Sequence, residues 1–305
     1  MLGQGTQLRV ESALVTGEGT LIQQVTPLSR TDFEARRHSL GFAVEDLGPQ
    51  LLGPSFINGH THLAMAALRG LELKALEGNV MESLYYLVES HMQADDIRAF
   101  VRLGAYESLL SGVTACWDHY YHAEAIALGL QDVGICGTVA PTLQDLGGPG
   151  QHQWREALDS TQRLYENSAL QAAGISPVLG PHATDTVSPA LWHEVKTLAQ
   201  RYQLPIHCHV AQSLEEYQRI DEAYNTTPVG YLQQQGILDV EVPMVLVHSL
   251  LLSEHDFSLL SPARHILGYC PFSQLQFGFP AAAEQWWAKG FKVQVGTDAG
   301  ACNDT

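Results

Sequence analysis

Four side chains of the kinds that bind metal ions stand at the ends of apolar runs in separate parts of the sequence. These side chains are His60, His62, His209 and Asp298. The runs before them are rich in β-branched and other apolar residues, as buried parallel strands are. The carboxyl ends of such strands meet at one end of a (β/α)8 barrel, where these barrels keep their chemistry. Three imidazoles and a carboxylate suit a zinc-class cation with a coordination place left for water, so the pattern predicts a metal-dependent hydrolase.

A fifth candidate, His248, follows another apolar run of the same kind. A single His-x-His pair is weak evidence for a metal site, because alternation along any strand places both rings on one face. Histidines also cap helices and fill cores, and this sequence contains 14 of them. The joint pattern is more specific, since ligand-type residues end several strands in one α/β rhythm. We therefore favour a shared metal site over isolated core histidines.

Eight short apolar runs predict the strands that would position these side chains. They cover residues 54–60, 113–118, 134–141, 174–181, 204–210, 243–249, 265–271 and 291–298. Amphipathic stretches lie between the runs, as in the βα units of a parallel sheet. Three stretches begin with helix start signals, a proline after Ser188 and an acidic residue three positions after Ser213 and Ser253. The sequence predicts an α/β protein with a (β/α)8, or TIM, barrel.

The first 50 residues have a different pattern. Residues 8–25 resemble one or two hairpins, with Gly17 to Gly19 as a turn. Residues 26–43 have no clear period and receive no assignment. The predicted domains are therefore an N-terminal β segment over residues 1–50 and the barrel over residues 51–305.

The composition narrows the classes of function. The 305 residues include only 16 Lys and Arg, and the formal net charge is −17. Nucleic-acid backbones and anionic membranes need clustered positive charge, so neither is an expected partner. The sequence has no run of 18 apolar residues and no signal-peptide features at its start, and its five cysteines are scattered without a CxxC pair. We expect a cytoplasmic protein that acts on a small molecule.

The strand ends resemble those of the amidohydrolase superfamily, in particular its branch of aminohydrolases and chlorohydrolases, which includes cytosine, guanine, S-adenosylhomocysteine and triazine deaminases. The matching segments follow the family's order and cover residues 56–63, 181–183, 206–211, 270–274 and 296–298. The resemblance implies homo-oligomers and a small β-sandwich built from both chain ends. This chain ends seven residues after Asp298, so we expect the C-terminal part of that sandwich to be missing from the sequence.

The resemblance also implies that His60, His62, His209 and Asp298 bind one divalent ion, zinc or iron. Relatives with two ions carry a bridging lysine at the end of the fourth strand, and no lysine stands there in this chain. A bound divalent ion lowers the pKa of water from about 15.7 to about 7, which provides hydroxide at neutral pH. Asp298 would bind the ion and also accept the proton of that water as general base.

Other residues receive roles from the resemblance and from their places near strand ends. His248 would orient the hydroxide or stabilise an oxyanion, with a core histidine as the alternative. His182 would face the substrate ring or the developing oxyanion, and His207 would contact the metal ligands without binding the ion itself. Glu89 is a candidate substrate contact after the first strand. Residues 119–122 follow the second strand, where they would line the pocket or form a solvated or packed loop.

The chain departs from the family at Gln212, where relatives usually have glutamate. In the family that glutamate hydrogen-bonds a ring nitrogen of the substrate and carries the proton of water to it. An amide keeps the hydrogen bonds but does not ionise near neutral pH. General acid–base help of this kind contributes about 10²–10⁴-fold to a rate. Three outcomes are compatible with Gln212. The substrate needs no proton at that atom, another group supplies the proton, or the activity is weak.

Three functions are compatible with these residues. The leading hypothesis is hydrolytic deamination of a purine-, pyrimidine- or triazine-like heterocycle. The second is opening of a cyclic amide or displacement of a halide, and the group released would distinguish it. The third is a catalytically impaired relative that binds metal or ligand, which Gln212 and the short C-terminus suggest.

Overall fold

The computed structural model describes residues 2–4, 7–9, 12–19, 21–41, 43–71, 81–276, 278 and 283–300. The chain divides into two compact units, Met1–Ser55 and Phe56–Thr305, and each is described by itself. Within the described ranges, no helix is both long and apolar enough to cross a membrane.

The first unit consists of two short hairpins followed by a helix. The antiparallel pairs are β1 (Leu2–Gln4) with β2 (Gln7–Arg9) and β3 (Ala13–Glu18) with β4 (Leu21–Pro27). The segment left without a sequence assignment contains α1 (Arg30–Arg36) and the 3-10 turn η1 (Arg37–Ser39). Ser29 begins this helix, because its hydroxyl accepts a hydrogen bond from the Asp32 backbone N–H at 3.1 Å. Membership of this unit in a composite sandwich stays a prediction.

The second unit is an α/β barrel whose strands pair in parallel. Its strands are β5 (Phe56–His62), β6 (Val113–Tyr120), β7 (Cys136–Leu143), β8 (Ile175–Pro177), β9 (Gly180–Pro181), β10 (Ile206–Val210), β11 (Met244–His248), β12 (His265–Tyr269), β13 (Lys292–Val295) and β14 (Asp298–Ala299). β8 and β9 both pair with β7 and share the fourth strand position, and β13 and β14 share the eighth. All eight predicted strands are found, the fourth and eighth each divided in two.

Parallel pairing leads from each strand position to the next around the barrel. β5 to β8 form one run, and β10 to β13 form another. The bridges Leu179–Ile206 and Ala183–His209 join the two runs on one side. On the other side, β14 pairs with β5 where Asp298 lies opposite Thr61. This is the (β/α)8 barrel that the sequence predicts.

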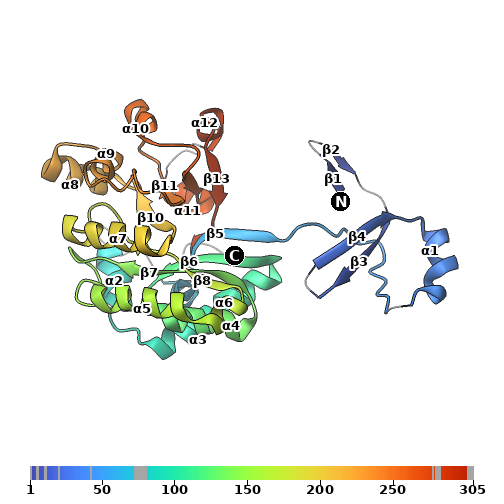
Figure 1. Ribbon diagram of the computed structural model, residues 1–305. Coiled ribbons are helices and arrows are strands. Elements are labelled where there is room, and N and C mark those ends of the chain that lie inside the picture. The colour runs from blue at the N-terminus through green and yellow to red at the C-terminus, as the bar shows by residue number, and fades with distance from the viewer. Residues whose placement is uncertain are drawn as a thin grey trace. The chain divides into compact units, whose positions relative to one another are not determined.

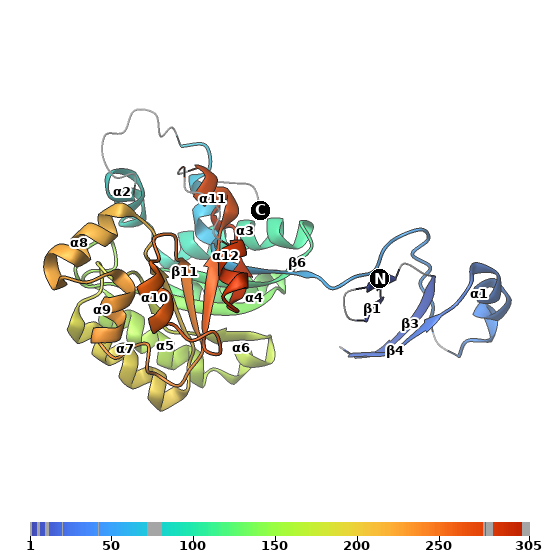
Figure 2. The ribbon, with the colours of Figure 1, turned by 90° about the horizontal axis from the view of Figure 1, so that it is seen from above.

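Helices connect the strands and cover the outside of the barrel. In chain order they are η2 (Leu63–Leu68), η3 (Met81–Tyr85), α2 (Tyr86–Glu89), α3 (Ala94–Leu110), α4 (Ala123–Val133), α5 (Trp154–Glu166), α6 (Ser168–Ala172), α7 (Pro189–Tyr202), α8 (Leu214–Tyr224), α9 (Pro228–Gln234), α10 (Glu254–Leu259), α11 (Pro271–Gln276) and α12 (Ala283–Ala288). Figures 1 and 2 show α3 to α7 outside the strands. The three predicted start signals are confirmed, because Ser188, Ser213 and Ser253 each accept a hydrogen bond from the backbone N–H three residues on.

Two apolar clusters hold the helices against the strands. One includes the buried Trp192, Tyr231 and Trp286 of α7, α9 and α12 and packs against β10 to β12. The other includes Ile97 of α3 and Leu130 of α4 and packs against β6 to β8. Full burial of one such leucine or isoleucine stabilises the fold by about 1.5–3 kcal/mol. The strand ends therefore project from a close-packed scaffold.

The eighth strand is divided where its backbone passes very close to β5. A Cβ atom on Gly296 would lie 2.5 Å from the carbonyl oxygen of His60 and 2.6 Å from its backbone nitrogen, so only glycine fits there. Asp298 then adopts a left-handed φ of 62°. Aspartate is one of the few residues besides glycine that are enriched in this conformation. The break in the strand thus brings the Asp298 carboxylate beside the end of β5.

Candidate metal centre and substrate cavity

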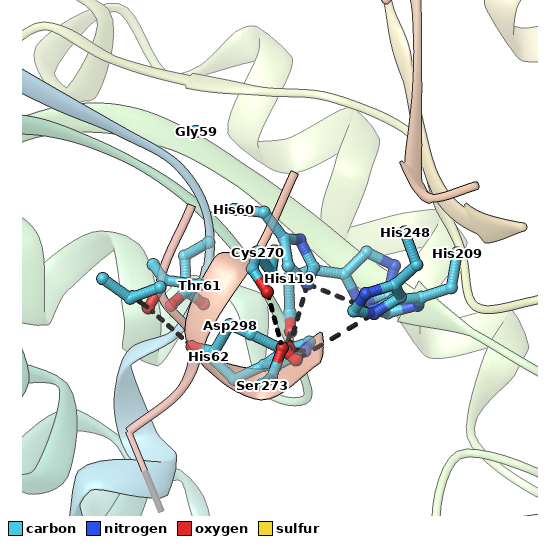
Figure 3. Close-up of polar contacts among 12 residues, drawn as sticks. Gly59, His60, Thr61, His62, His119, His209, His248, Cys270, Ser273 and Asp298 are labelled. Atoms are coloured by element: carbon cyan, nitrogen blue, oxygen red, sulfur yellow. Dashed lines mark hydrogen bonds and ion pairs between the residues drawn. The ribbon is translucent and has the colours of Figure 1, made fainter. Parts of the chain in front are cut away.

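The four predicted ligand residues lie together at the carboxyl ends of β5, β10 and the eighth strand (Figure 3). The Nε2 atoms of His60 and His209 are 3.2 Å apart. The Oδ1 atom of Asp298 lies 3.4 Å from His60 Nε2 and 3.3 Å from His62 Nε2. Four potential ligand atoms from three strand positions therefore gather in one place.

The spacing of these atoms fits a tetrahedral zinc site. Zinc–nitrogen bonds are about 2.0–2.1 Å long, so two ligand atoms at a tetrahedral angle are about 3.3–3.4 Å apart. The separations of 3.2, 3.3 and 3.4 Å agree with this value. Two sets, His60 with His62 and His209, and His60 with His248 and Asp298, keep their ligand atoms within 4.8 Å of one another. The side chains present thus fit a divalent cation of the zinc class.

Backbone carbonyl groups set the orientation of two of these histidines. The Nδ1 atom of His62 lies 2.5 Å from the carbonyl oxygen of His119, and that of His209 lies 2.7 Å from the carbonyl oxygen of His182. A carbonyl oxygen only accepts hydrogen bonds, so each imidazole carries its proton on Nδ1. The Nε2 lone pairs of both rings are thereby left for a metal ion, as in most protein sites with histidine ligands.

A side chain takes the same position behind the third histidine. The Nδ1 atom of His60 lies 2.9 Å from His207 Nε2, and both side chains are fully buried. Burial holds the pKa of His207 well below its usual value, so its ring is neutral. Its Nε2 can therefore accept a hydrogen bond from His60 Nδ1. Among the described residues, His207 Nδ1 has no hydrogen-bond partner. His207 therefore lies directly behind a candidate ligand.

Asp298 carries the negative charge of the cluster. Burial alone would raise the pKa of this carboxyl group, but contacts with His60 and His62 outweigh burial and hold the pKa well below its usual value. Burial lowers the pKa of His60 to about 4. For His62, burial acts in the same direction, but the Asp298 contacts outweigh it and raise the pKa. The cluster thus stabilises an ionised carboxylate, which is the form that binds cations.

Two further predicted residues border the cluster. The His248 ring stacks on the His209 ring with centroids 5.5 Å apart, and its Nε2 lies 4.0 Å from Asp298 Oδ2. His248 has a left-handed φ of 71°, a strained conformation that is concentrated at functional sites. The His182 ring lies 5.1 Å from that of His209, and its Nδ1 contacts the Thr186 hydroxyl at 2.8 Å.

A cavity of about 850 Å³ adjoins the ligand cluster, because His62, His209 and Asp298 are among its lining residues. This volume lies in the upper part of the range of about 300–1,000 Å³ found for small-molecule sites. The predicted substrate contacts His182, Gln212 and Glu89 also line it, as does His248. Further lining side chains are aromatic and come from Tyr85, Tyr86, His119, Tyr120 and Tyr121. The cavity can hold an aromatic heterocycle with a substituent.

Glu89 of α2 lines this cavity. Its Oε1 accepts a hydrogen bond from the Tyr120 hydroxyl at 2.7 Å, whereas its Oε2 has no partner within the described part of the chain. Glu89 is only 6% exposed, and burial raises its pKa. An acceptor in this state is suited to a hydroxyl or amino donor on a ligand.

A buried carboxyl group holds the backbone of Gln212. Glu216 accepts hydrogen bonds from the Gln212 N–H at 2.7 Å and from the Thr184 hydroxyl at 2.5 Å. In a complete capping box, Glu216 would accept a hydrogen bond from the Ser213 N–H, but its carboxyl group instead joins the segments that follow β9 and β10. Glu216 is 1% exposed, and burial raises its pKa to about 7.

Replacing Glu216 with glutamine should stabilise the protein at alkaline pH but not at acidic pH. Ionisation of Glu216 is disfavoured in the folded protein. The free energy of unfolding of the wild type therefore falls as the pH rises from 4.5, the pKa of an ordinary glutamate, to about 7, the pKa of Glu216 in the fold. A neutral glutamine can accept from the Gln212 N–H and donate to Thr184. We expect the free energy of unfolding to rise by about 3 kcal/mol at about pH 8 and to be unchanged below about pH 4. Urea unfolding across this range measures the effect, and a gain independent of pH would contradict a buried charge.

Several cavity residues were missed by the sequence reasoning because they lie beyond the strand ends. Asp185 follows β9, and Glu215, Glu216 and Arg219 belong to α8. The only feature of the sequence that could have indicated them is closeness to a predicted site residue, since Asp185 comes three residues after His182. Of residues 119–122, the first three line the cavity and His122 is not among its lining residues.

Comparison with known proteins identifies relatives of the barrel. The model of the Amidohydrolase family matches residues 51–305. The 5-methylthioadenosine/S-adenosylhomocysteine deaminase of Aquifex aeolicus (strain VF5) is 32% identical over 253 residues, which cover 82% of this chain and 58% of that protein. This chain thus spans less than two thirds of the length of that relative.

Solved structures share the fold at lower identity. The guanine deaminase of C. acetobutylicum with bound guanine superposes with a TM-score of 0.79 at 16% identity, over 92% of this chain and 68% of the other. An adenosine deaminase from Xanthomonas campestris with bound zinc gives a TM-score of 0.74 at 23% identity, over 82% of this chain and 57% of the other.

Proposed function

The chain belongs to the amidohydrolase family, and from this premise we propose that it is the barrel of a metal-dependent hydrolase that deaminates a nitrogen heterocycle. The observation that carries the proposal is the gathering of three Nε2 atoms and one carboxylate beside a cavity of about 850 Å³. The name of the Aquifex relative supports an adenine nucleoside with a 5′ substituent as the substrate class.

The proposed ligands are His60, His62, His209 and Asp298, and the proposed ion is a single zinc. Their tetrahedral spacing and the zinc in the Xanthomonas structure support this assignment. Zinc would act as a Lewis acid that lowers the pKa of water from about 15.7 to about 7. Iron is the alternative, which metal analysis distinguishes.

The side chains around this centre would move a proton and hold the substrate. Asp298 is held ionised and would accept the proton of the attacking water. His248, with Nε2 4.0 Å from Asp298, would donate a hydrogen bond to the substrate atom that gains negative charge. Gln212 and His182 would contact the ring, and Glu89 would accept a hydrogen bond from a substituent.

Ammonia release by the zinc-loaded chain tests the proposal. Adenosine, 5′-methylthioadenosine, guanine and a triazine are each supplied to protein whose zinc content is measured in the same sample. We expect ammonia and the corresponding 6-oxo purine from the adenine nucleosides. Full zinc occupancy without ammonia from any compound would contradict deamination and support a binding protein.

Gln212 favours a second candidate function. An amide at this position cannot deliver a proton to a departing amino group, whereas halide leaves without one. Displacement of halide from a heterocycle therefore competes with deamination, whereas opening of a cyclic amide, whose leaving nitrogen also needs a proton, gains no support from Gln212. Chloride release from a chlorinated triazine, measured beside ammonia release from the amino analogue, separates the two.

Replacing His248 with alanine should leave the zinc content unchanged and reduce turnover by at least about 10²-fold. The reason is that His248 Nε2 lies 4.0 Å from Asp298 Oδ2, outside the closely spaced set of nitrogen atoms. That set comes from His60, His62 and His209. Zinc content and kcat are measured on the same preparation. If zinc is lost in step with activity, His248 is a metal ligand and the proposed role is wrong.

A further inference from the structure

One part of the cavity lining carries more acidic than basic side chains. Glu82, Asp185 and Glu215 line it together with Arg219, which is the only Lys or Arg among the described lining residues. We call these four residues the acidic wall. Three carboxylates and one guanidinium give the acidic wall a formal charge of −2.

The guanidinium of the acidic wall is already engaged by two carboxylates. Arg219 Nη2 donates to Glu82 Oε1 at 2.7 Å, and Arg219 Nη1 donates to Asp185 Oδ2 at 3.1 Å. The Asp185 side chain is only 7% exposed, so this contact lies largely out of solvent. Two carboxylates thus already surround this guanidinium and outnumber its single positive charge.

A separate observation is an unpaired carboxylate oxygen in the same cavity lining. Glu89 lines the cavity and is 6% exposed, yet its Oε2 has no hydrogen-bond partner among the described residues. Glu89 is not part of the acidic wall, because it belongs to α2 and its other oxygen is bound by Tyr120. A ligand that brings donors would satisfy this acceptor.

We propose that the acidic wall selects substrates whose far end carries a positive charge, such as a primary ammonium, and disfavours a carboxylate at that end. The inference rests on the proposed function, in which the heterocycle lies against the metal ligands and its substituent extends along the cavity. It goes further by assigning the charge of the substituent.

The physical basis is the number of donors and the sign of the local field. An ammonium has three N–H donors for Glu82, Asp185 and Glu215 and is attracted by a negatively lined cleft. A carboxylate meets like charge there, because the charge of Arg219 is already matched by Glu82 and Asp185. Because Glu82 and Arg219 are about half exposed, salt should weaken the selection, with a screening length of about 8 Å at physiological ionic strength.

A charge series of nucleosides tests the selection. Three 5′-thioadenosines with aminoethyl, hydroxyethyl and carboxymethyl groups on sulfur have similar size and differ in end charge. For the zinc-loaded chain at low salt, we expect kcat/KM to be at least about tenfold higher for aminoethyl than for carboxymethyl, with hydroxyethyl between them. The dissociation constant of each compound, measured by calorimetry, should follow the same order.

Two variants should move the aminoethyl-to-carboxymethyl ratio in opposite directions. Glu82→Gln removes a negative charge and should lower the ratio at least about threefold, whereas Arg219→Gln leaves two carboxylates unpaired and should raise it. Glu241→Gln is the matched control, because Glu241 pairs with Arg264 and does not line the cavity. Its ratio should equal that of the wild type.

The outcomes separate this inference from the proposed function. If no nucleoside releases ammonia but the dissociation constants keep the predicted order and the variants shift it, deamination is wrong and the acidic wall is supported. Turnover with a carboxymethyl compound as good as the aminoethyl one would overturn the acidic wall and leave deamination standing. A ratio that Glu82→Gln and Arg219→Gln shift in the same direction, or absence of binding for all three compounds, would also overturn it.

Discussion

Replacing His209 with alanine should leave a folded chain that no longer retains zinc and whose turnover is at least about 10³-fold lower. His209 is the single proposed ligand from β10, and its Nε2 lies 3.2 Å from that of His60. Its removal leaves two histidines of one strand and Asp298, which no longer surround an ion. Metal content after gel filtration and circular dichroism on the same sample measure the two parts of this result.

The matched control is His193→Ala, which removes an exposed imidazole from α7 and should retain one zinc per chain. Full metal content in His209→Ala would contradict the proposed ligand set. Two ions per active wild-type chain would contradict the single-ion site.

Replacing Gln212 with glutamate should raise deamination of at least one common purine, pyrimidine or triazine by about tenfold or more. The new carboxylate would lie in the cavity near a divalent cation, which favours its ionised form and lets it accept a proton from water. The native reaction should slow, because a substrate atom that accepts a hydrogen bond from the amide would face a charge instead. Paired kinetics of the two proteins at equal zinc content measure both effects.

Gln218→Glu is the control for added charge, since Gln218 is an exposed residue of the adjoining helix α8. It should change no rate beyond about twofold, as expected for a surface substitution away from the site. If Gln212→Glu also changes no rate, position 212 does not face the reacting ring, and its role inferred from the family must be abandoned.

The barrel and the ligand cluster were predictable because both depend on short-range signals. An apolar run ending in histidine or aspartate specifies a buried strand and its polar end at once, as at His209 and Asp298. Parallel pairing then brings such ends together regardless of their separation in the sequence. The helix starts at Ser188 and Ser253 were equally local, since a cap involves residues only three positions apart.

The rest of the site depends on contacts that no local pattern carries. Arg219 joins Glu82 and Asp185 from three separate segments, so its place in the cavity follows only from the assembled barrel. Glu216 stands at a position typical of helix capping, so the sequence pattern did not predict its bonds to Gln212 and Thr184. The eighth strand is divided where Gly296 passes close to β5. The pattern of apolar and polar residues along the sequence does not predict this contact.

The hydrogen bonds that orient the candidate ligand histidines differ in how easily a mutation can remove them. His62 and His209 are oriented by main-chain oxygens, which a point mutation cannot remove. His60 is oriented by the side chain of His207, which a single codon change can replace. Homologues that use another metal, or a less basic ligand set, should therefore differ at position 207. Side-chain changes at positions 119 and 182 would leave the orienting carbonyl groups in place.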